Sequence, residues 1–212
     1  MKKRYVIGLS VIVGLIVLIL AFTVYMHFHP MENKEQIKVN VLDSISEYGY
    51  SLDDRDSDLF KEEYNKLKEI LDSDEINEED YSEEVARLFI IDLYSIKTKV
   101  NKYDVGGKEF YFTDKVTMYE NKVKDILYDL VEDDSYGNRT QQLPIVSSIE
   151  TKNITVDNYK LGEEEVDAYV IELEWEYERD LGYDNKGFVT VVKDGIKWSV
   201  VAFTTDMNSE ED

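Results

Sequence analysis

The chain has 212 residues and a formal net charge of −22, with 43% hydrophobic and 12% aromatic residues. It is too apolar and too aromatic for a disordered protein, and its length suits one folded domain. The negative charge repels phosphate backbones, so we expect no nucleic-acid partner. The absence of cysteine excludes disulfides, thiolate metal sites and a catalytic cysteine.

The only two histidines, His27 and His29, end an apolar segment near the N-terminus. The residues that follow contain none, which excludes histidine-based triads and histidine-ligated zinc from the rest of the chain. We therefore expect no metal site and no cofactor.

Residues 5–28 form an apolar run without a charged side chain, directly after Lys2, Lys3 and Arg4. A helix of this length would cross a hydrocarbon core of about 30 Å. The preceding basic residues predict a cytoplasmic N-terminus and a single-pass signal-anchor in the cell membrane. A cleaved signal peptide is the alternative, although its apolar region normally spans only about 7 to 15 residues.

These patterns predict the organisation of the whole chain. In order, the expected parts are a cytoplasmic basic tail (1–4), a transmembrane helix (5–28), a stalk (29–36), an extracytoplasmic domain (37–206) and an acidic tail (207–212).

Apolar periodicity predicts three helices in the first half of the domain. An acidic cluster, Asp53–Asp58, marks the start of the first helix, and Asn77 precedes the second, central helix. The predicted segments in chain order are a strand over 37–50, a helix ending near 72, a helix from 78 to about 100, a short strand over 110–112 and a helix from 113 to about 131.

The chain after Leu143 predicts an antiparallel sheet, with strands over 145–156, 166–178, 187–192 and 196–203. In the second strand, apolar residues from Tyr169 to Tyr177 alternate with glutamates, so the two kinds of side chain should occupy opposite faces. Asp194-Gly195 between the last two strands predicts a tight type I′ turn.

The closing hairpin, with Asp194-Gly195 followed by Lys197-Trp198-Ser199-Val200, resembles the Asp-Gly-x-Trp-x-Val/Ile ending of many members of the nuclear transport factor two-like superfamily, the cystatin-like α+β cones. The order and lengths of the predicted elements over residues 55–205 are similar too. The resemblance implies an α+β fold in which three helices pack against a curved antiparallel sheet of four to six strands. A strand over 37–50 departs from the simplest cone.

Membrane-anchored members of this superfamily include scaffold subunits of type IV secretion and conjugation machines, and the layout predicted here is similar to theirs. The bias toward Lys, Glu, Asn, Ile and Tyr is also similar to that of exported proteins of low-GC bacteria. The resemblance implies a partner protein in the cell envelope.

The predicted acidic face of the second strand, Glu172, Glu174, Glu176 and Glu178, is the sharpest surface feature. It would suit a basic protein partner or divalent cations. The alternative is a solvated face whose charges are offset by lysines on a neighbouring strand.

Four further residues are candidates for acid–base chemistry in a pocket: Asp92, Tyr94, Tyr103 and Asp104. Burial would raise the pKa of a carboxyl group there and so suit it to proton transfer. For Asp92 the alternative is a place at the edge of the apolar stripe of its helix. We assign no catalytic residue.

The expected function is that of a non-enzymatic protein-interaction domain of a cell-envelope assembly. A cone that binds a small molecule or peptide is the second hypothesis. A carboxylate-dependent hydrolase or isomerase is the third, and a deep pocket with a desolvated carboxylate would favour the last two hypotheses.

Overall fold

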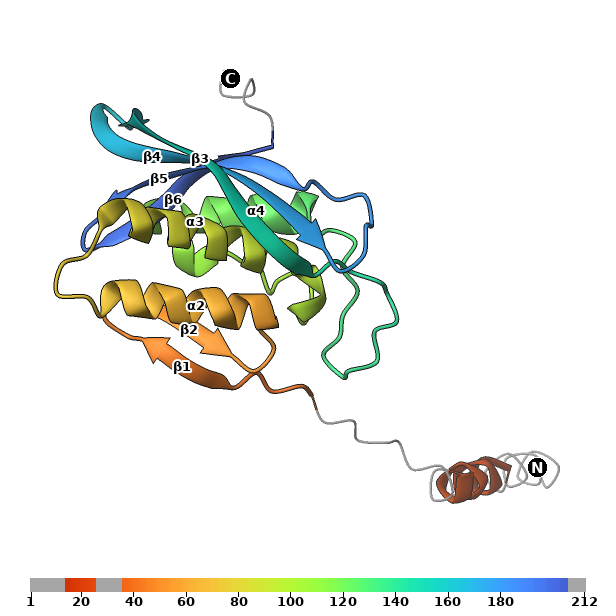
Figure 1. Cartoon of the computed structure of the whole chain (residues 1–212). Helices are drawn as coiled ribbons and strands as arrows, with labels where there is room; N and C mark the ends of the chain where they lie inside the picture. Colours follow the sequence, from red (N-terminus) through yellow and green to blue (C-terminus); the bar gives the residue numbers. More distant parts are fainter. Residues whose placement is uncertain (1–13, 26–35, 206–212) are drawn as a thin grey trace, which may run out of the picture. The chain divides into compact units, whose positions relative to one another are not determined.

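The computed structural model describes residues 14–25 and 36–205 (Figure 1). They belong to two compact units, Met1–Glu35 and Gln36–Asp212. The described part of the first unit is one helix over residues 14–25. Within the described ranges, no helix is long and apolar enough to cross a membrane.

The prediction of a transmembrane signal-anchor over residues 5–28 is therefore corrected. At 1.5 Å per residue, the helix over residues 14–25 rises about 18 Å, which is short of a hydrocarbon core of about 30 Å. Residues 5–13 and 26–28 of the predicted span lie outside the described residues, as do the predicted basic tail, the stalk as far as residue 35 and the acidic tail.

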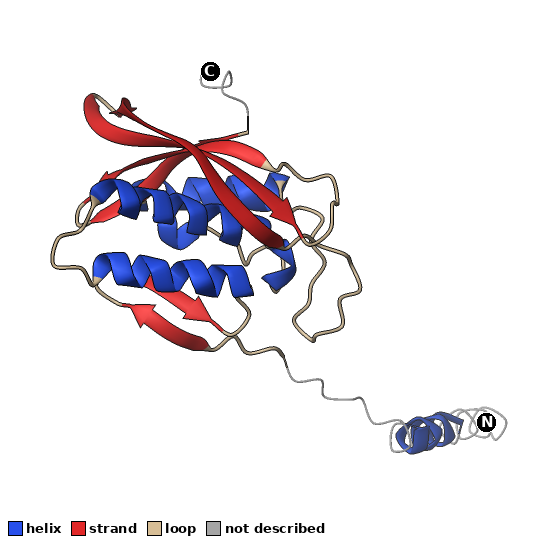
Figure 2. Cartoon of the chain, in the orientation of Figure 1, coloured by secondary structure: helices blue, strands red, loops and turns tan. Residues whose placement is uncertain are grey.

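The described part of the second unit has an α+β fold, as predicted, with its helices between two sheets (Figure 2). Its strands are β1 (Val41–Ile45), β2 (Tyr50–Asp53), β3 (Val146–Leu161), β4 (Glu164–Tyr177), β5 (Lys186–Asp194) and β6 (Lys197–Thr204). Its helices are α2 (Asp58–Leu71), α3 (Glu78–Tyr94) and α4 (Val116–Ile126), with short 3₁₀ helices η1 (Ile96–Thr98), η2 (Lys108–Phe110) and η3 (Thr113–Lys115).

The prediction of a single sheet is wrong, because β1 and β2 form a two-stranded sheet apart from the four-stranded sheet β3-β4-β5-β6. The predicted strand over 37–50 is broken by a turn at which Gly49 has a φ of 71°, a conformation that favours glycine. The chain folds back there, and Tyr50 pairs with Ile45.

Local capping explains where α2 and α3 begin. The Ser57 hydroxyl accepts a hydrogen bond from the Phe60 N–H at the start of α2, so a serine caps this helix. At the start of α3, the Asn77 side chain accepts bonds from the N–H groups of Glu79 and Asp80.

The central helix, α3, ends at Tyr94 and not near residue 100 as predicted. Ser95 leaves the helical conformation, and η1 follows it. Ile96 in η1 is fully buried, so the apolar pattern continues past the end of the helix.

The third predicted helix is shorter than expected, because η3 replaces its first turn and α4 ends at Ile126. The predicted strand over 110–112 is reduced to an isolated parallel bridge between Tyr111 and Val200.

The core forms where α3 packs against the large sheet on one side and against α2 on the other. The predicted apolar face of β4 contributes Ile171, Leu173 and Trp175, all of them buried. In the β5–β6 hairpin Gly195 has a φ of 67°, and among the described residues only glycines have a positive φ. The central residues are therefore Gly195 and Ile196 in a type II′ turn, which corrects the predicted type I′ turn.

Four connecting segments gather at one end of this unit, on the right in Figure 1: β2 to α2, α3 to η2, α4 to β3 and β4 to β5. Loops supported by a rigid scaffold are common places for binding residues.

Candidate functional site

Three adjoining hollows lie along these connecting segments. The first has a volume of about 330 Å³ and shares Ile145 and Glu178 with the middle hollow, of about 390 Å³. The middle hollow shares Arg55, Asp56 and Thr98 with the third hollow, of about 420 Å³. We call this row the loop-end groove; its lining comes from segments 53–59, 97–104, 141–147 and 178–181, with Val39 and Lys108.

The wall formed by residues 97–99 is held in place by two arginines. Arg55 Nε donates to the Thr98 carbonyl at 2.6 Å, and Arg139 donates to the carbonyls of Lys97 and Lys99 at 2.8 and 2.9 Å. Asp134 lies 3.5 Å from the Arg55 guanidinium and 3.9 Å from that of Arg139. These bonds satisfy the carbonyls at the end of η1, so both arginines stabilise the groove wall.

Asp92 lies behind the third hollow and fixes the loop that forms it. Lys99 Nζ donates to one carboxylate oxygen of Asp92, and the Gly107 N–H donates to the other at 2.5 Å. Burial disfavours the charge on Lys99, but the Asp92 carboxylate outweighs it and raises the Lys99 pKa. A Cβ on Gly106 would lie 2.1 Å from the Asp92 carbonyl oxygen, so the loop can approach α3 only with glycine there.

The other predicted acid–base candidates are not brought together. Asp104 lines the third hollow, but its Oδ2 accepts a hydrogen bond from the Val100 N–H at 2.9 Å. Tyr103 lines the same hollow and is 70% exposed. Tyr94 is buried in the core against Trp175, with their ring centroids 5.0 Å apart. Two of the candidates therefore line the groove, with Asp92 behind it and Tyr94 elsewhere.

Asp56 is the groove carboxyl with the clearest electrostatic perturbation. Burial, and then the nearby charges of Asp92 and Asp53, raise its pKa to about 7. Its Oδ2 accepts a hydrogen bond from the Asp53 N–H at 2.7 Å. The sequence predicts Asp56 within a helix-start cluster, and no local pattern shows that Thr98 and Lys99, more than 40 residues further along the chain, line the same hollow.

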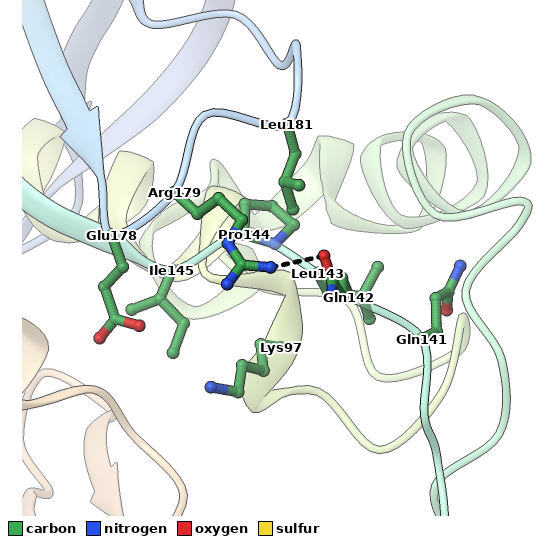
Figure 3. Close-up of a pocket in the computed structure, with 9 residues that line it drawn as sticks. All are labelled: Lys97, Gln141, Gln142, Leu143, Pro144, Ile145, Glu178, Arg179 and Leu181. Carbon is green, nitrogen blue, oxygen red and sulfur yellow. Dashed lines mark hydrogen bonds between the residues drawn. The ribbon is translucent and has the colours of Figure 1, made fainter.

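Figure 3 shows the first hollow, where the charged ends of Lys97, Glu178 and Arg179 surround Ile145. Arg179 Nη1 donates to the Gln142 side-chain oxygen at 2.6 Å. Leu143 and Pro144 are buried beneath these polar groups. Among the described residues, neither Lys97 nor Arg179 has a carboxylate within ion-pair distance, whereas Arg55 and Lys99 nearby both do.

The predicted acidic face is divided by the end of β4. Glu172, Glu174 and Glu176 lie on the strand, but β4 ends at Tyr177, and Glu178 lines the first and middle hollows. Lys152 on β3 reaches Glu174 at 3.1 Å.

The Ser148 hydroxyl also donates to Glu176 at 3.2 Å. These contacts from the neighbouring strand favour the interpretation of a solvated face. In residues 14–25 and 36–205, no group of three or more Asp, Glu or His side chains could hold a metal ion.

A second charged cluster, which the sequence did not indicate, joins α2 to α3. Arg87 donates to both carboxylate oxygens of Glu63, at 2.8 and 3.1 Å, and to the Ile149 carbonyl at 3.2 Å. Lys66 also reaches Glu63, at 3.0 Å. Burial, followed by the neighbouring Glu63, raises the pKa of Glu84 to about 9, so Glu84 is neutral at pH 7.

Comparisons of the chain with protein-family models, with known proteins and with solved structures found no match. The resemblance to the nuclear transport factor two-like superfamily, and to secretion scaffolds within it, therefore stays a prediction. Function must be inferred from the groove itself.

Proposed function

We propose that the domain is a non-enzymatic protein-binding module whose loop-end groove holds an extended segment of a partner protein. The observation that carries this proposal is the row of three hollows with shared lining residues. Each has a volume within the range usual for ligand sites, of roughly 300 to 1,000 Å³. A row of three suits an elongated ligand better than a compact one.

The lining of the groove supports a peptide as the ligand. The lining combines apolar side chains, such as Ile145 and Leu181, with charged groups of both signs. An extended peptide offers side chains at intervals of roughly 7 Å on each face, together with backbone N–H and C=O groups. Such a ligand could place successive side chains in successive hollows.

The hydrogen bonding of the groove carboxylates argues for binding and against catalysis. Asp53 accepts bonds from the N–H groups of Arg55 and Asp56, and Asp104 accepts one from Val100. Asp56 titrates near neutrality, but it too accepts a backbone bond, from Asp53. These carboxylates fix the conformation of the loops through hydrogen bonds. The binding surface is therefore ordered before a ligand binds, which lowers the entropy cost of binding.

Two features of the expected function stay predictions. The placement of the domain outside the cytoplasmic membrane depends on residues 1–28, of which only 14–25 are described. Membership of a cell-envelope assembly was inferred from the resemblance.

Panning a library of random decapeptides, displayed with free C-termini, against the immobilised full-length chain tests the proposal. We expect enriched peptides whose binding is reduced about tenfold or more by Ser147→Arg, because this side chain would fill the middle hollow. Ser148→Arg is the matched control, since Ser148 points to Glu176 and not into the groove. If no peptide is enriched, or if Ser147→Arg leaves the binding of enriched peptides unchanged, the proposal is wrong.

A further inference from the structure

We infer that the first hollow recognises the C-terminal carboxylate of the bound segment, together with an aliphatic last side chain. The inference rests on the proposed function of the groove and assigns the direction in which the bound segment runs along it. The first hollow is an end of the row, since it shares lining residues with the middle hollow and none with the third. A chain end can therefore lie there.

The charges of the first hollow point to an anionic group. Three cations near the groove already have a carboxylate partner: Lys99 pairs with Asp92, and Arg55 and Arg139 share Asp134. Lys108 is the single cation of the third hollow without a carboxylate within ion-pair distance among the described residues. Lys97 and Arg179 line one hollow, and neither has a carboxylate within ion-pair distance among the described residues. In a protein with a net charge of −22, two such cations in one hollow favour an anionic ligand group.

The donors in this hollow match the geometry of a carboxylate. Arg179 uses one terminal nitrogen on Gln142, and a guanidinium has further N–H groups that can form a two-point contact with a carboxylate. The Lys97 ammonium carries three N–H donors. In Figure 3 the Arg179 guanidinium lies above and the Lys97 ammonium below the Ile145 side chain.

The remaining lining residues match the rest of a C-terminal residue. Leu143, Pro144 and Leu181 provide an apolar surface for an aliphatic side chain. Glu178 lines both the first and the middle hollow, so its carboxylate stands where the chain would pass between them and can accept a backbone N–H. A chain-terminal residue presents these three groups, carboxylate, side chain and N–H, on a single unit.

The test compares each peptide enriched on the full-length chain in two synthetic forms, with a free C-terminal acid and with a C-terminal amide. Titration calorimetry should show that amidation weakens binding about 10- to 100-fold, the loss expected when charge-assisted hydrogen bonds are removed. In the variant Lys97→Gln with Arg179→Gln, the acid should bind as weakly as the amide. Lys122→Gln, an exposed position on α4 outside the groove, should keep the full preference for the acid.

The outcomes separate this inference from the proposed function. If acid and amide bind equally but Ser147→Arg abolishes binding, the groove binds peptides and the inference about the terminus is wrong. The same holds if an internal Asp or Glu of the peptide, and not the terminus, accounts for the effect of the double substitution. If Ser147→Arg has no effect either, the proposed function is also wrong. Arg179→Lys keeps the charge but loses the two-point contact, so an intermediate preference is expected.

Discussion

The two charged clusters of this domain differ in the hydrogen-bond partners of their arginines. Arg87, between α2 and α3, donates to both oxygens of Glu63 and to a backbone carbonyl, and its side chain is 14% exposed. Arg179, in the first hollow, donates to a neutral glutamine side chain. The first arrangement is satisfied internally and stabilises packing. The second leaves donors for a ligand, and this difference distinguishes a structural cluster from a binding site.

Removing Arg87 should give the largest effect. Arg87→Met leaves the Glu63 carboxylate, 2% exposed, with Lys66 as its remaining cation, so we expect a loss of about 3–5 kcal/mol in the free energy of unfolding. Urea denaturation at pH 7 measures it. Glu84→Gln is the control, because Glu84 is already neutral at this pH, and its effect should be small. A loss below about 1 kcal/mol for Arg87→Met would show that the cluster is not structural.

A smaller loss is expected for Gly107→Ala, in the loop that holds the third hollow. Gly107 has a φ of 78°, and a Cβ there would lie 2.6 Å from the Tyr119 hydroxyl oxygen and 2.8 Å from the Phe89 ring. Backbone strain and crowding together should cost about 2–4 kcal/mol.

Gly162→Ala provides the matched control for Gly107→Ala. Gly162 also has a positive φ, of 67°, but a Cβ there would meet no atom within 4 Å beyond its chain neighbours, so only the strain of about 1 kcal/mol should appear. Equal losses for the two variants in thermal or urea denaturation would contradict close packing of the Gly107 loop.

Asp56→Asn should alter how stability depends on pH. The Asp56 pKa is about 7 in the folded protein and about 3.9 in an unfolded chain, so ionisation opposes folding. The favourable contribution is complete below about pH 4 and is lost as pH rises through 7. The full difference between these two pKa values corresponds to roughly 4 kcal/mol, and solvent screening of the partly buried carboxyl reduces this value. Compared with wild type, Asp56→Asn should therefore gain roughly 2 kcal/mol between pH 4 and pH 8. A stability difference that does not change with pH would place Asp56 in a solvated environment.

Lys152→Ala should have the smallest effect. Lys152 bridges Glu150 and Glu174 on the exposed face of the large sheet, at 2.7 and 3.1 Å. Exposed pairs of this kind contribute about 0.2–1 kcal/mol, and peptide binding should not change. A marked loss of peptide binding would indicate that the peptide binds the acidic face of the sheet and not the groove.

Local patterns were sufficient for much of the fold and for little of the site. The alternation along β4 and the capping residues before α2 and α3 are local, so β4 and the starts of these two helices lie close to where the sequence predicts them, whereas the end of α3 does not. The lining of the loop-end groove comes from segments more than 120 residues apart, between Arg55 and Arg179, and no local pattern encodes their approach.

The burial of Glu84 does not follow from the sequence for a related reason. The helix α3 is covered on several sides, so Ser82 and Glu84 are buried along with its apolar stripe, and amphipathic periodicity does not mark them. Glu178 was misplaced because β4 ends one residue earlier than the alternation of side chains suggests.

Mapping a bound peptide onto the full-length chain by amide chemical shifts tests the central claim most directly. Titration of an enriched free-acid peptide into the ¹⁵N-labelled protein should shift the amide signals of segments 53–59, 97–104, 141–147 and 178–181, with the changes around Lys97 and Arg179 lost when the peptide is amidated. Shifts confined to Glu172, Glu174, Glu176 and their neighbours on β3 would contradict the account.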